Sequence, residues 1–378
     1  MRLGTKDRAV VYALDRLEPP PRAVDWSLAA TIAVLVGTGL YSLVVGDPSG
    51  AWVFDVHAVA AFALVVLLAF KLRRVATRLR PNRLTRVRFV SILLALTALG
   101  ALGTGLWWAF GGSVRVGPWG LLMVHMTLGV AVPVVLLWHL RHRYHSPAGA
   151  THQGRRTALQ YAAVVGLSAL AWRGQRAAND LLDTAGSDRR FTGSREEGSG
   201  EGNAFPVTSW VADDPTPVDV EDWELRVDGL VDDPATLGVD DLGLGDETAD
   251  DERGDLATDA ERRAVLDCTS GWYSDHDWRG LAVGDLLDAV EPTDDARWVQ
   301  FRSVTGYRWS LPVEEAREAL LATHVDGERI SHDHGFPMRL VAPGRRGFQW
   351  VKWVTDVRAT RRRDFSESVA IFVSGFEE

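Results

Sequence analysis

Five apolar segments fill most of the first half of the chain, and they constrain its fold more than any other feature. They lie at residues 25–46, 51–72, 87–110, 120–140 and 157–172. A helix needs about 20 apolar residues to cross a bilayer. The first four segments meet this length, whereas the fifth has 16 residues and either crosses the membrane or lies on its surface. The pattern predicts an all-α transmembrane bundle of four to five helices within residues 1–176.

Basic residues indicate how these helices are oriented. Arg and Lys are dense in the N-terminal segment and in the loops at 71–88 and 141–156, whereas the loops at 47–50 and 111–119 hold one Arg between them. Loops rich in Arg and Lys face the cytoplasm. The N-terminus is therefore expected in the cytoplasm of a multi-pass protein of the cell membrane. If the fifth segment crosses, the second half of the chain lies outside the cell.

The second half carries the opposite charge. Residues 1–176 contain 20 Lys+Arg and 6 Asp+Glu, whereas residues 177–378 contain 21 and 44. Nucleic acid is not an expected partner, because binding phosphates requires a basic face. Dense carboxylates with only three Lys in the whole chain indicate a halophilic protein, since charge keeps proteins soluble in high salt. The alternative is a GC-rich genome with acidic loops.

Composition also suggests the boundaries of the second half. Residues 177–204 are charged and rich in Gly and Ser, which predicts a flexible linker. Residues 205–378 alternate short strand-like and helix-like segments, which predicts an α+β domain. Within it, residues 243–263 are too acidic to pack and are expected to form a surface insertion. Inspection of the sequence identifies no internal repeat.

Two histidines lie inside the apolar segments at matching depths. His57 is the seventh residue of its segment and His125 the sixth, so both imidazoles are expected about 10 Å below the outer face. Ionisable residues within a membrane are candidate functional groups. The pair could bind the iron of a b-type haem as axial ligands, or it could only join neighbouring helices. A second haem is not expected, because His139 follows His125 by 14 residues but Lys71 holds the equivalent position after His57.

Cys268 is the only cysteine in the chain. A single cysteine excludes an intramolecular disulfide, a Cys-rich zinc site and a Cys-ligated iron–sulfur cluster. A lone Cys is usually a small buried hydrophobe. This one ends a strand-like segment and precedes Gly, Trp and Tyr, and a thiolate is also a ligand for a soft metal ion. In that case the other sulfur ligands of the metal must come from a cofactor.

Two sequence blocks resemble the molybdopterin-binding domain of the sulfite oxidase family. They are CTSGWYSDHDWRGLAVGDLLDAVEPTDDARWVQFRS at residues 268–303 and HGFPMRLVAPGRRGFQWVKWV at residues 334–354. The resemblance covers about residues 205–360 and is greatest to the bacterial periplasmic methionine-sulfoxide reductases. It implies a sulfite-oxidase-like fold for the second half and a molybdenum cofactor bound to it.

The resemblance also implies roles for individual residues. Cys268 would be the protein thiolate that binds molybdenum. Contacts to the molybdopterin are implied for Ser303, His334, Arg339, Trp350, Val351 and Lys352. Sulfite oxidases proper follow the cysteine with a basic cluster, whereas this chain continues with TSGWY, which argues against sulfite as the substrate. Tyr273 and His276 are the candidate proton donors, although both could serve only in packing.

These observations predict a membrane-anchored molybdenum-cofactor oxidoreductase. It would transfer an oxygen atom on a small sulfur substrate of the sulfoxide type or a related one. Electrons would pass through the haem to or from quinone or another membrane electron-transfer partner, with membrane lipid around the bundle. Two alternatives stay open: the bundle is only an anchor without haem, or the protein is a non-catalytic membrane sensor or interaction protein.

Overall fold

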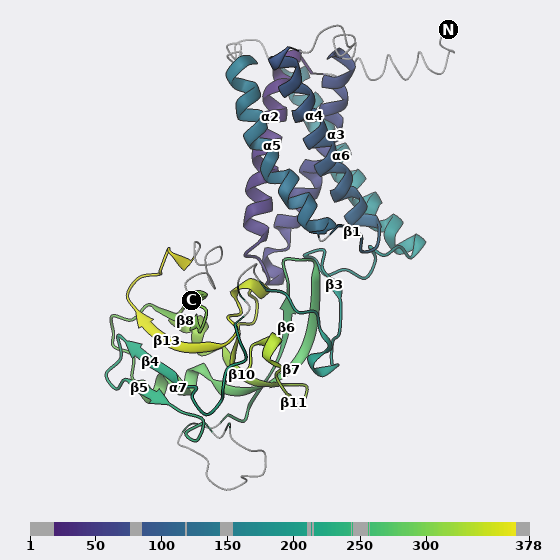
Figure 1. Cartoon of the computed structure of the whole chain (residues 1–378). Coiled ribbons are helices and arrows are strands. Elements are labelled where there is room, and N and C mark those ends of the chain that lie inside the picture. Colours follow the sequence, from purple (N-terminus) through teal and green to yellow (C-terminus); the bar gives the residue numbers. More distant parts are fainter. Residues whose placement is uncertain are drawn as a thin grey trace, which may run out of the picture. The chain divides into compact units, whose positions relative to one another are not determined.

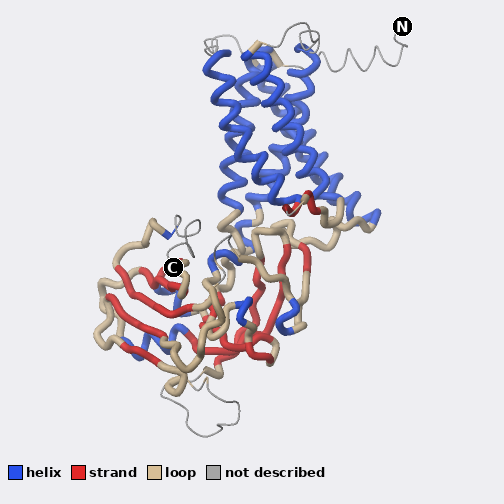
Figure 2. Tube along the Cα trace, in the orientation of Figure 1, coloured by secondary structure: helices blue, strands red, loops and turns tan. Residues whose placement is uncertain are grey.

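The computed structural model describes residues 19–75, 85–117, 119–143, 154–209, 213, 215–242, 244, 256 and 258–367. The chain divides into two compact units (Figure 1). The first comprises Met1–Val44 and Ser49–Gly193, and the second comprises Val45–Pro48 and Ser194–Glu378. The helical first half and the mixed α and β second half confirm the coarse prediction, and Figure 2 shows this division in the secondary structure.

The first unit is a helical bundle with one small ribbon. Its long helices are α2 (Pro21–Ser42), α3 (Trp52–Val75), α4 (Arg86–Phe110), α5 (Leu121–Arg143) and α6 (Arg155–Leu182). The strands β1 (Arg115–Val116) and β2 (Trp119–Gly120) pair between α4 and α5. The two hairpins α2–α3 and α4–α5 each pack as a pair, and α2 also packs against α5.

Four helices of the described residues are long and apolar enough to cross a membrane. They correspond to Pro21–Ser42, Pro48–Val75, Arg86–Phe110 and Leu121–His142, with mean hydropathy between 1.6 and 2.4. The first four predicted segments are thus confirmed as apolar helices. Helix α6 does not meet this criterion, although with 28 residues it is longer than the predicted segment of 16.

Helix α6 packs through a polar stripe. Its buried positions include Gln160, Ser168, Gln175 and Asn179. The amides of the last two donate to the Ala109 carbonyl near the end of α4, at 3.2 and 2.9 Å. The stripe therefore satisfies a helix-end carbonyl that lacks an intrahelical partner.

The predicted linker at 177–204 is corrected by the structure. Its first residues, up to Leu182, continue α6, and residues 195–196 form a strand. Between them, the Arg189 guanidinium lies 4.3 Å from the ring centroid of Trp108 and donates to the Gly111 carbonyl at 2.6 Å. The glycines of this segment serve local turns, as the positive φ of Gly193 (79°) shows. Composition alone does not distinguish such turns from a flexible chain.

The second unit contains two sheets in its described part. In the first, the order β11-β10-β7-β3 is extended by β12 on β10 and by β6 on β7. Its strands are β3 (Arg195–Glu196), β6 (Ala260–Asp267), β7 (Trp272–Ala282), β10 (Leu320–Val325), β11 (Glu328–Arg329) and β12 (Arg339–Val341). The β3–β7 pair is parallel and the other pairs are antiparallel.

The second sheet has the order β5-β4-β13-β8-β9. Its strands are β4 (Leu225–Gly229), β5 (Ala235–Leu237), β8 (Trp298–Ser303), β9 (Arg308–Pro312) and β13 (Val354–Thr360). Two short helices accompany the sheets, α7 (Val283–Val290) and α8 (Val313–Arg317). Most of the predicted insertion at 243–263 lies outside the described residues, and its last four residues belong to β6.

Strand β7 organises the first sheet. Trp272, Ser274, His276 and Trp278 are buried on one face, while the residues between them are less buried. Trp278 is fully buried, and its indole donates to the Ala264 carbonyl on β6 at 3.1 Å. This alternation has the period of two expected for a strand. It determines which side chains of the CTSGWYSDHDW block face the core.

Candidate functional site

Cys268 lies in the tight turn between β6 and β7. Its N–H donates to the Trp272 carbonyl at 2.9 Å, and Gly271, at φ 101°, donates back to the Cys268 carbonyl. The side chain is buried, yet its sulfur lies 3.1 Å from the Ser270 hydroxyl and 3.8 Å from that of Thr208. A cysteine that serves only as a hydrophobe has no need of hydroxyl neighbours. These contacts therefore favour the ligand role over simple packing.

A buried ion pair supports this turn. Arg346 donates to Asp267 at 2.8 Å and to the Cys268 carbonyl at 3.1 Å, and both charged side chains are almost fully buried. The Ser194 hydroxyl also donates to Asp267, at 2.7 Å. Removing one partner of a buried pair costs about 3–5 kcal/mol. Arg346 thus holds the residue before the thiol and the carbonyl of Cys268 itself, and the sequence gives no sign of the pair because the partners lie 79 positions apart.

His334 is fixed by hydrogen bonds at both ring nitrogens. Nε2 lies 2.9 Å from the Phe205 carbonyl and Nδ1 lies 2.7 Å from the Ser331 hydroxyl. Because a carbonyl only accepts, Nε2 carries the proton and the Ser331 hydroxyl donates to Nδ1. Burial, with the positive charges of Arg339 and Lys352, lowers the pKa of His334 to about 4. The imidazole is therefore neutral at physiological pH.

This depressed pKa predicts a pH dependence of stability. The unfolded chain takes up a proton at an ordinary His pKa of about 6.5, whereas folded His334 does so only near 4. Stability is therefore complete above pH 6.5 and is lost as the pH falls towards 4. We expect the free energy of unfolding of wild type minus that of His334→Gln to decrease across this window in pH-dependent denaturation. A constant difference would contradict the neutral imidazole.

Arg339 on β12 is a buried cation without a carboxylate. Its Nη1 donates to the His334 carbonyl at 2.9 Å, and its guanidinium lies 5.3 Å from the Trp278 ring centroid. Burial lowers its pKa to about 9, partly opposed by the negative charge of Cys268. Within the described residues, its Nε has no hydrogen-bonding partner and no Asp or Glu pairs with it. Such a group needs an anion to offset its desolvation.

Lys352 adds a second cation to the same site. Its Nζ donates to the Asp333 carbonyl at 2.7 Å and to the Ser209 hydroxyl at 3.2 Å. Burial and the charge of Arg339 lower its pKa to about 8, opposed by Asp213 and Cys268. Gly335, at φ 112°, lets the two basic segments approach, since a Cβ there would lie 3.0 Å from the Cβ atoms of both cations. The result is a compact electropositive site.

The three remaining residues that are predicted to contact the cofactor, Ser303, Trp350 and Val351, are all buried. Ser303 ends β8 and its hydroxyl lies 3.2 Å from that of Thr305. Val351 is fully buried. Trp350 is also buried, with its ring 5.8 Å from that of Trp278, and its indole N–H has no partner among the described residues. Buried donors without partners are rare, so this N–H is available to a ligand.

The structure separates the two predicted proton donors. His276 shares the buried face of β7 with Trp272 and Trp278, whereas Tyr273 lies on the opposite face because successive strand residues alternate. The ring of Phe205 joins His276 to the cation site, with centroids 4.7 Å from His276 and 3.9 Å from His334. Of the two, His276 is therefore the one that Phe205 connects to the predicted cofactor-contact residues.

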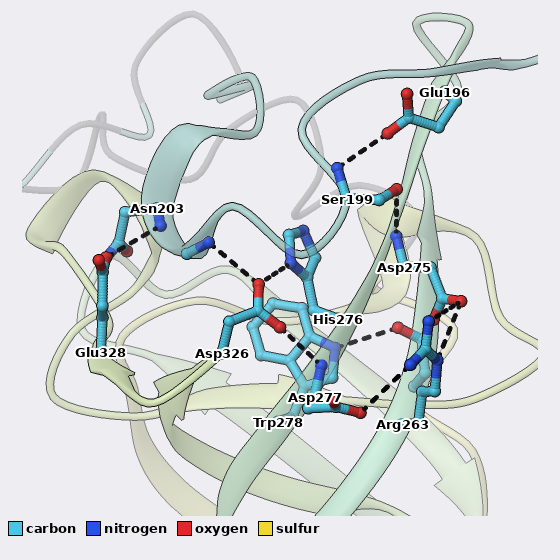
Figure 3. A network of polar contacts seen from close by, with 12 residues as sticks. Glu196, Ser199, Asn203, Arg263, Asp275, His276, Asp277, Trp278, Asp326 and Glu328 are labelled. Carbon is cyan, nitrogen blue, oxygen red and sulfur yellow. Dashed lines mark hydrogen bonds and ion pairs between the residues drawn. The ribbon is translucent and has the colours of Figure 1, made fainter.

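His276 is held by a carboxylate network (Figure 3). Its Nδ1 lies 2.6 Å from Asp326, which also accepts from the N–H groups of Gly202 and Asp277. Burial raises the pKa of Asp326, but the hydrogen bonds from His276 and Asp277 outweigh it, so the pKa lies below its usual value. The Nε2 of His276 is buried without a partner in the described part of the chain.

The segment 194–205 fastens this network, and the sequence analysis assigned all of it except Phe205 to a linker. Its backbone follows the edge of β7 through hydrogen bonds to Gly271, Tyr273 and Asp275. Figure 3 shows the Asp275 N–H donating to the Ser199 hydroxyl, and Asn203 donating to the Glu328 carboxylate. It ends at Phe205, whose carbonyl fixes His334. The residues that lead to this contact thus look unstructured by composition, although they follow the edge of β7.

The histidines of the helical unit also meet. His57 on α3 and His125 on α5 have ring centroids 6.3 Å apart with an interplanar angle of 74°. Lys71, at the position that a second pair would require to be histidine, forms an ion pair with Asp25 at 2.6 Å. The bundle brings the predicted pair of imidazoles together.

Comparison with known proteins identifies the second unit. Residues 212–368 match the family model of the oxidoreductase molybdopterin binding domain. The match supports an oxidoreductase of the sulfite oxidase type for this part of the chain. Cys268 and the predicted contact residues from Ser303 to Lys352 all lie within it. The match begins at residue 212, so it does not include the helices of the first unit.

Several curated proteins are similar to this molybdopterin-binding domain. The protein-methionine-sulfoxide reductase catalytic subunit MsrP of Xanthomonas axonopodis pv. citri is 29% identical over 153 residues, 36% of this chain and 44% of that protein. The uncharacterized oxidoreductase YuiH of Bacillus subtilis is 28% identical over 161 residues, 42% of this chain and 75% of that protein. The chain thus spans less than half the length of the Xanthomonas relative.

More distant matches have other names. A nitrate reductase [NADPH] of Fusarium oxysporum is 29% identical over 161 residues, 38% of this chain and 18% of that protein. The sulfane dehydrogenase SoxCD from Paracoccus pantotrophus is a solved structure with 22% identity and a TM-score of 0.34, over 39% of this chain and 40% of that one. The names of these similar proteins differ in substrate.

Proposed function

We propose that the chain is a membrane-anchored molybdenum-cofactor oxidoreductase that transfers an oxygen atom on a small sulfur compound of the sulfoxide class. The observation that carries this proposal is the pairing of a hydroxyl-lined thiol, Cys268, with the buried Arg339 and the half-buried Lys352, neither of which forms an ion pair with a carboxylate among the described residues. An anionic molybdopterin bound through its phosphate would supply the missing negative charge, and the thiol would supply a metal ligand.

The residues of the site fit this cofactor. Arg339 and Lys352 bind and orient its anionic groups, and the unpartnered indole N–H of Trp350 can donate to it. Ser303 and His334 complete the proposed contacts, with His334 neutral so that it adds no further charge. Cys268 binds the metal. When bound, the cofactor supplies two-electron redox chemistry coupled to the movement of one oxygen atom.

Sulfoxide reduction consumes two electrons and two protons and releases a thioether and water. The proton source that we assign is His276, because it lies on the face of β7 that Phe205 connects to the cation site. Asp326 holds its Nδ1 and fixes the ring, which leaves Nε2 to carry and release a proton. Tyr273 stays a prediction as an alternative donor.

A pair of variants tests this assignment. We expect His276→Gln to lower kcat by about 10²–10⁴-fold, the usual contribution of a positioned acid or base, and to flatten the pH profile of kcat. Tyr273→Phe, on the opposite face of the same strand, is the matched control and is expected to retain most of the activity. Steady-state assays over pH give both results. A large loss in Tyr273→Phe alone would transfer the role to Tyr273.

The choice of a sulfoxide substrate has two supports. The residues after Cys268 are Thr, Ser, Gly, Trp and Tyr, which provide no cationic cluster for an anion such as sulfite. A protein-methionine-sulfoxide reductase catalytic subunit is also among the similar proteins. An apolar, aromatic approach to the metal suits a neutral sulfoxide better than a charged oxyanion.

The four apolar helices provide the membrane anchor in this proposal, with the N-terminus in the cytoplasm. Four crossings return the chain to the cytoplasm, so a molybdopterin-binding domain outside the cell requires that α6 also crosses. Membrane quinol is the proposed electron donor, through a haem in the helical unit. The second candidate function keeps the molybdenum enzyme but uses the bundle only as an anchor. The pairing of His57 with His125 favours the haem.

Turnover tests the proposed function. The full chain in detergent, produced in a salt-adapted host that makes the cofactor, is assayed for oxidation of a reduced viologen dye. We expect oxidation that depends on added methionine sulfoxide or dimethyl sulfoxide. Sulfite-dependent reduction of ferricyanide is the second assay. Turnover of sulfite but not of sulfoxides would contradict the substrate class, and no turnover by folded, molybdenum-loaded protein would contradict the enzyme.

A further inference from the structure

The helical unit contains an internal repeat that corrects the sequence analysis. Residues 37–41 of α2 read Gly-Thr-Gly-Leu-Tyr, and residues 103–107 of α4 read Gly-Thr-Gly-Leu-Trp. Each motif is followed by a helix with one histidine near its start, His57 on α3 and His125 on α5. The hairpins α2–α3 and α4–α5 are therefore two copies of one histidine-presenting unit.

The hydrogen bonds in each copy fix which imidazole nitrogen carries the proton. Thr38 Oγ1 donates its only hydrogen to the Val34 carbonyl at 2.7 Å, so it accepts from Nδ1 of His57 at 2.9 Å. Nδ1 of His125 lies 2.9 Å from the Ala101 carbonyl, which can only accept. Each histidine thus carries its proton on Nδ1. Nε2 keeps its lone pair, which is the form that binds a metal.

The separation of the rings matches coordination of one metal by both. With metal–imidazole bonds of about 2.0–2.1 Å, as at zinc, and a ring radius of roughly 1.1 Å, two imidazoles on opposite sides of one ion have centroids about 6.3 Å apart. The centroids of His57 and His125 are 6.3 Å apart. Two rings in direct contact also have centroids about 4.5–7 Å apart. The distance alone therefore does not distinguish metal coordination from ring packing, and the tautomers are needed as well.

The glycines of the motif give each imidazole its space. A Cβ on Gly105 would lie 2.9 Å from Cε1 of His125, and one on Gly39 would lie 3.5 Å from Cε1 of His57. A Cβ on the first glycine of either motif would meet no atom within 4 Å. Glycine inside a helix costs about 1 kcal/mol relative to alanine. The second glycine of each motif leaves room for the imidazole, and the first leaves open space for a flat ligand. These two requirements explain why both helices contain glycine despite its cost in helix stability.

We propose that His57 and His125 are the two axial ligands of one b-type haem held between the α2–α3 and α4–α5 hairpins, with Thr38 and the Ala101 carbonyl as positioning groups. Two protein ligands leave no open position on the iron, so the haem transfers electrons and does not bind a substrate. A membrane quinol would give its two electrons one at a time through this haem and release two protons as it becomes a quinone, which balances one oxygen transfer. This role rests on the proposed function.

The structure supports one haem rather than two. Lys71 lies 14 residues after His57, and its ammonium group forms an ion pair with Asp25 at 2.6 Å. His139, 14 residues after His125, lies 3.3 Å from the Ser91 hydroxyl on α4. No second imidazole is available opposite His139 in the described helices. The expected stoichiometry is one haem per chain.

Haem content and spectra of the full chain test the ligands. We expect the purified protein to contain one haem with the absorption and electron paramagnetic resonance spectra of two axial imidazoles. His57→Leu and His125→Leu are each expected to lose these spectra, whereas the matched control His139→Leu keeps them. Unchanged spectra in either of the first two variants would overturn the proposal, as would folded protein that binds no added hemin.

Two threonine variants test the positioning groups. Thr38→Val removes the only side-chain acceptor of His57 Nδ1, so we expect about 10–100-fold weaker haem binding and a higher reduction potential. A backbone carbonyl is near the ring in both copies, Leu35 for His57 and Ala101 for His125. Thr104 lies farther from its histidine, 3.3 Å against 2.9 Å for Thr38, so Thr104→Val is expected to change both quantities less. Equal effects from the two variants in hemin titration and redox titration would contradict the positioning role assigned to Thr38.

Molybdenum is measured in the same samples, so this inference and the proposed function can fail separately. Molybdenum without haem would overturn the haem site and leave the enzyme with an anchor only. Haem without molybdenum would support the haem site at His57 and His125 and would contradict the proposed function as a molybdenum enzyme.

Discussion

We expect Cys268→Ser to abolish sulfoxide reduction while the protein stays folded and keeps its cofactor. The sulfur of Cys268 is the group proposed to bind the metal directly, whereas Arg339 and Lys352 hold the anionic part of the cofactor. Loss of an outer partner of a metal site typically costs about 10–100-fold, and loss of a direct ligand is expected to cost more. Activity should therefore fall by more than about 100-fold, with molybdenum content little changed.

The measurement combines turnover of the reduced dye with molybdenum content and thermal unfolding. Cys268→Ala is the companion variant, since it lacks both the sulfur and a replacement oxygen. If the thiol were only a small buried hydrophobe, both variants would keep their activity per bound molybdenum and differ only in stability. That result would contradict the ligand role.

We expect Arg339→Met to weaken cofactor binding and at the same time to raise the stability of the cofactor-free protein. Arg339 is buried with its pKa lowered to about 9, and no carboxylate among the described residues offsets its charge. Arg339→Met removes this uncompensated charge and preserves much of the side-chain volume. We expect the protein made in a host that lacks the cofactor to gain stability, by roughly 1–4 kcal/mol. We expect the same variant to retain little molybdenum in a cofactor-producing host.

Arg346→Met is the matched control for this experiment. Arg346 is buried to a similar degree, but it is paired with Asp267. Removing it leaves a buried carboxylate alone, so stability should fall by about 3–5 kcal/mol. Chemical denaturation of both variants without cofactor gives the comparison. A loss of stability in Arg339→Met as large as that in Arg346→Met would show that Arg339 is structural and contradict the anion site.

The sequence predicts those features that depend on local patterns. Four spans follow from hydropathy, because about 20 apolar residues in a row have few alternatives to a membrane helix. The separation of Tyr273 from His276 was also accessible. Trp272 and Trp278 are large apolar residues an even number of positions from His276, and strand alternation then puts Tyr273 on the other face.

Other features depend on contacts between distant residues. The Asp267–Arg346 pair and the contact of Phe205 with His334 join positions 79 and 129 apart in the chain. The segment 194–205 was misassigned because Gly and Ser occur in tight turns as well as in flexible linkers. The repeated Gly-Thr-Gly motif was visible in the sequence. A motif of five residues within a long apolar region is easily overlooked. Its role becomes clear when the structure shows that each copy lies against a histidine.

X-ray absorption at the molybdenum edge tests whether Cys268 binds the metal, because it counts the sulfur atoms bound to molybdenum. The sample is the full chain purified with its cofactor, and Cys268→Ser is measured beside it. The account predicts molybdenum in both proteins, with one sulfur ligand fewer and one additional light-atom ligand in the variant. An identical sulfur count in the two spectra, or the absence of molybdenum from folded wild-type protein, would contradict it.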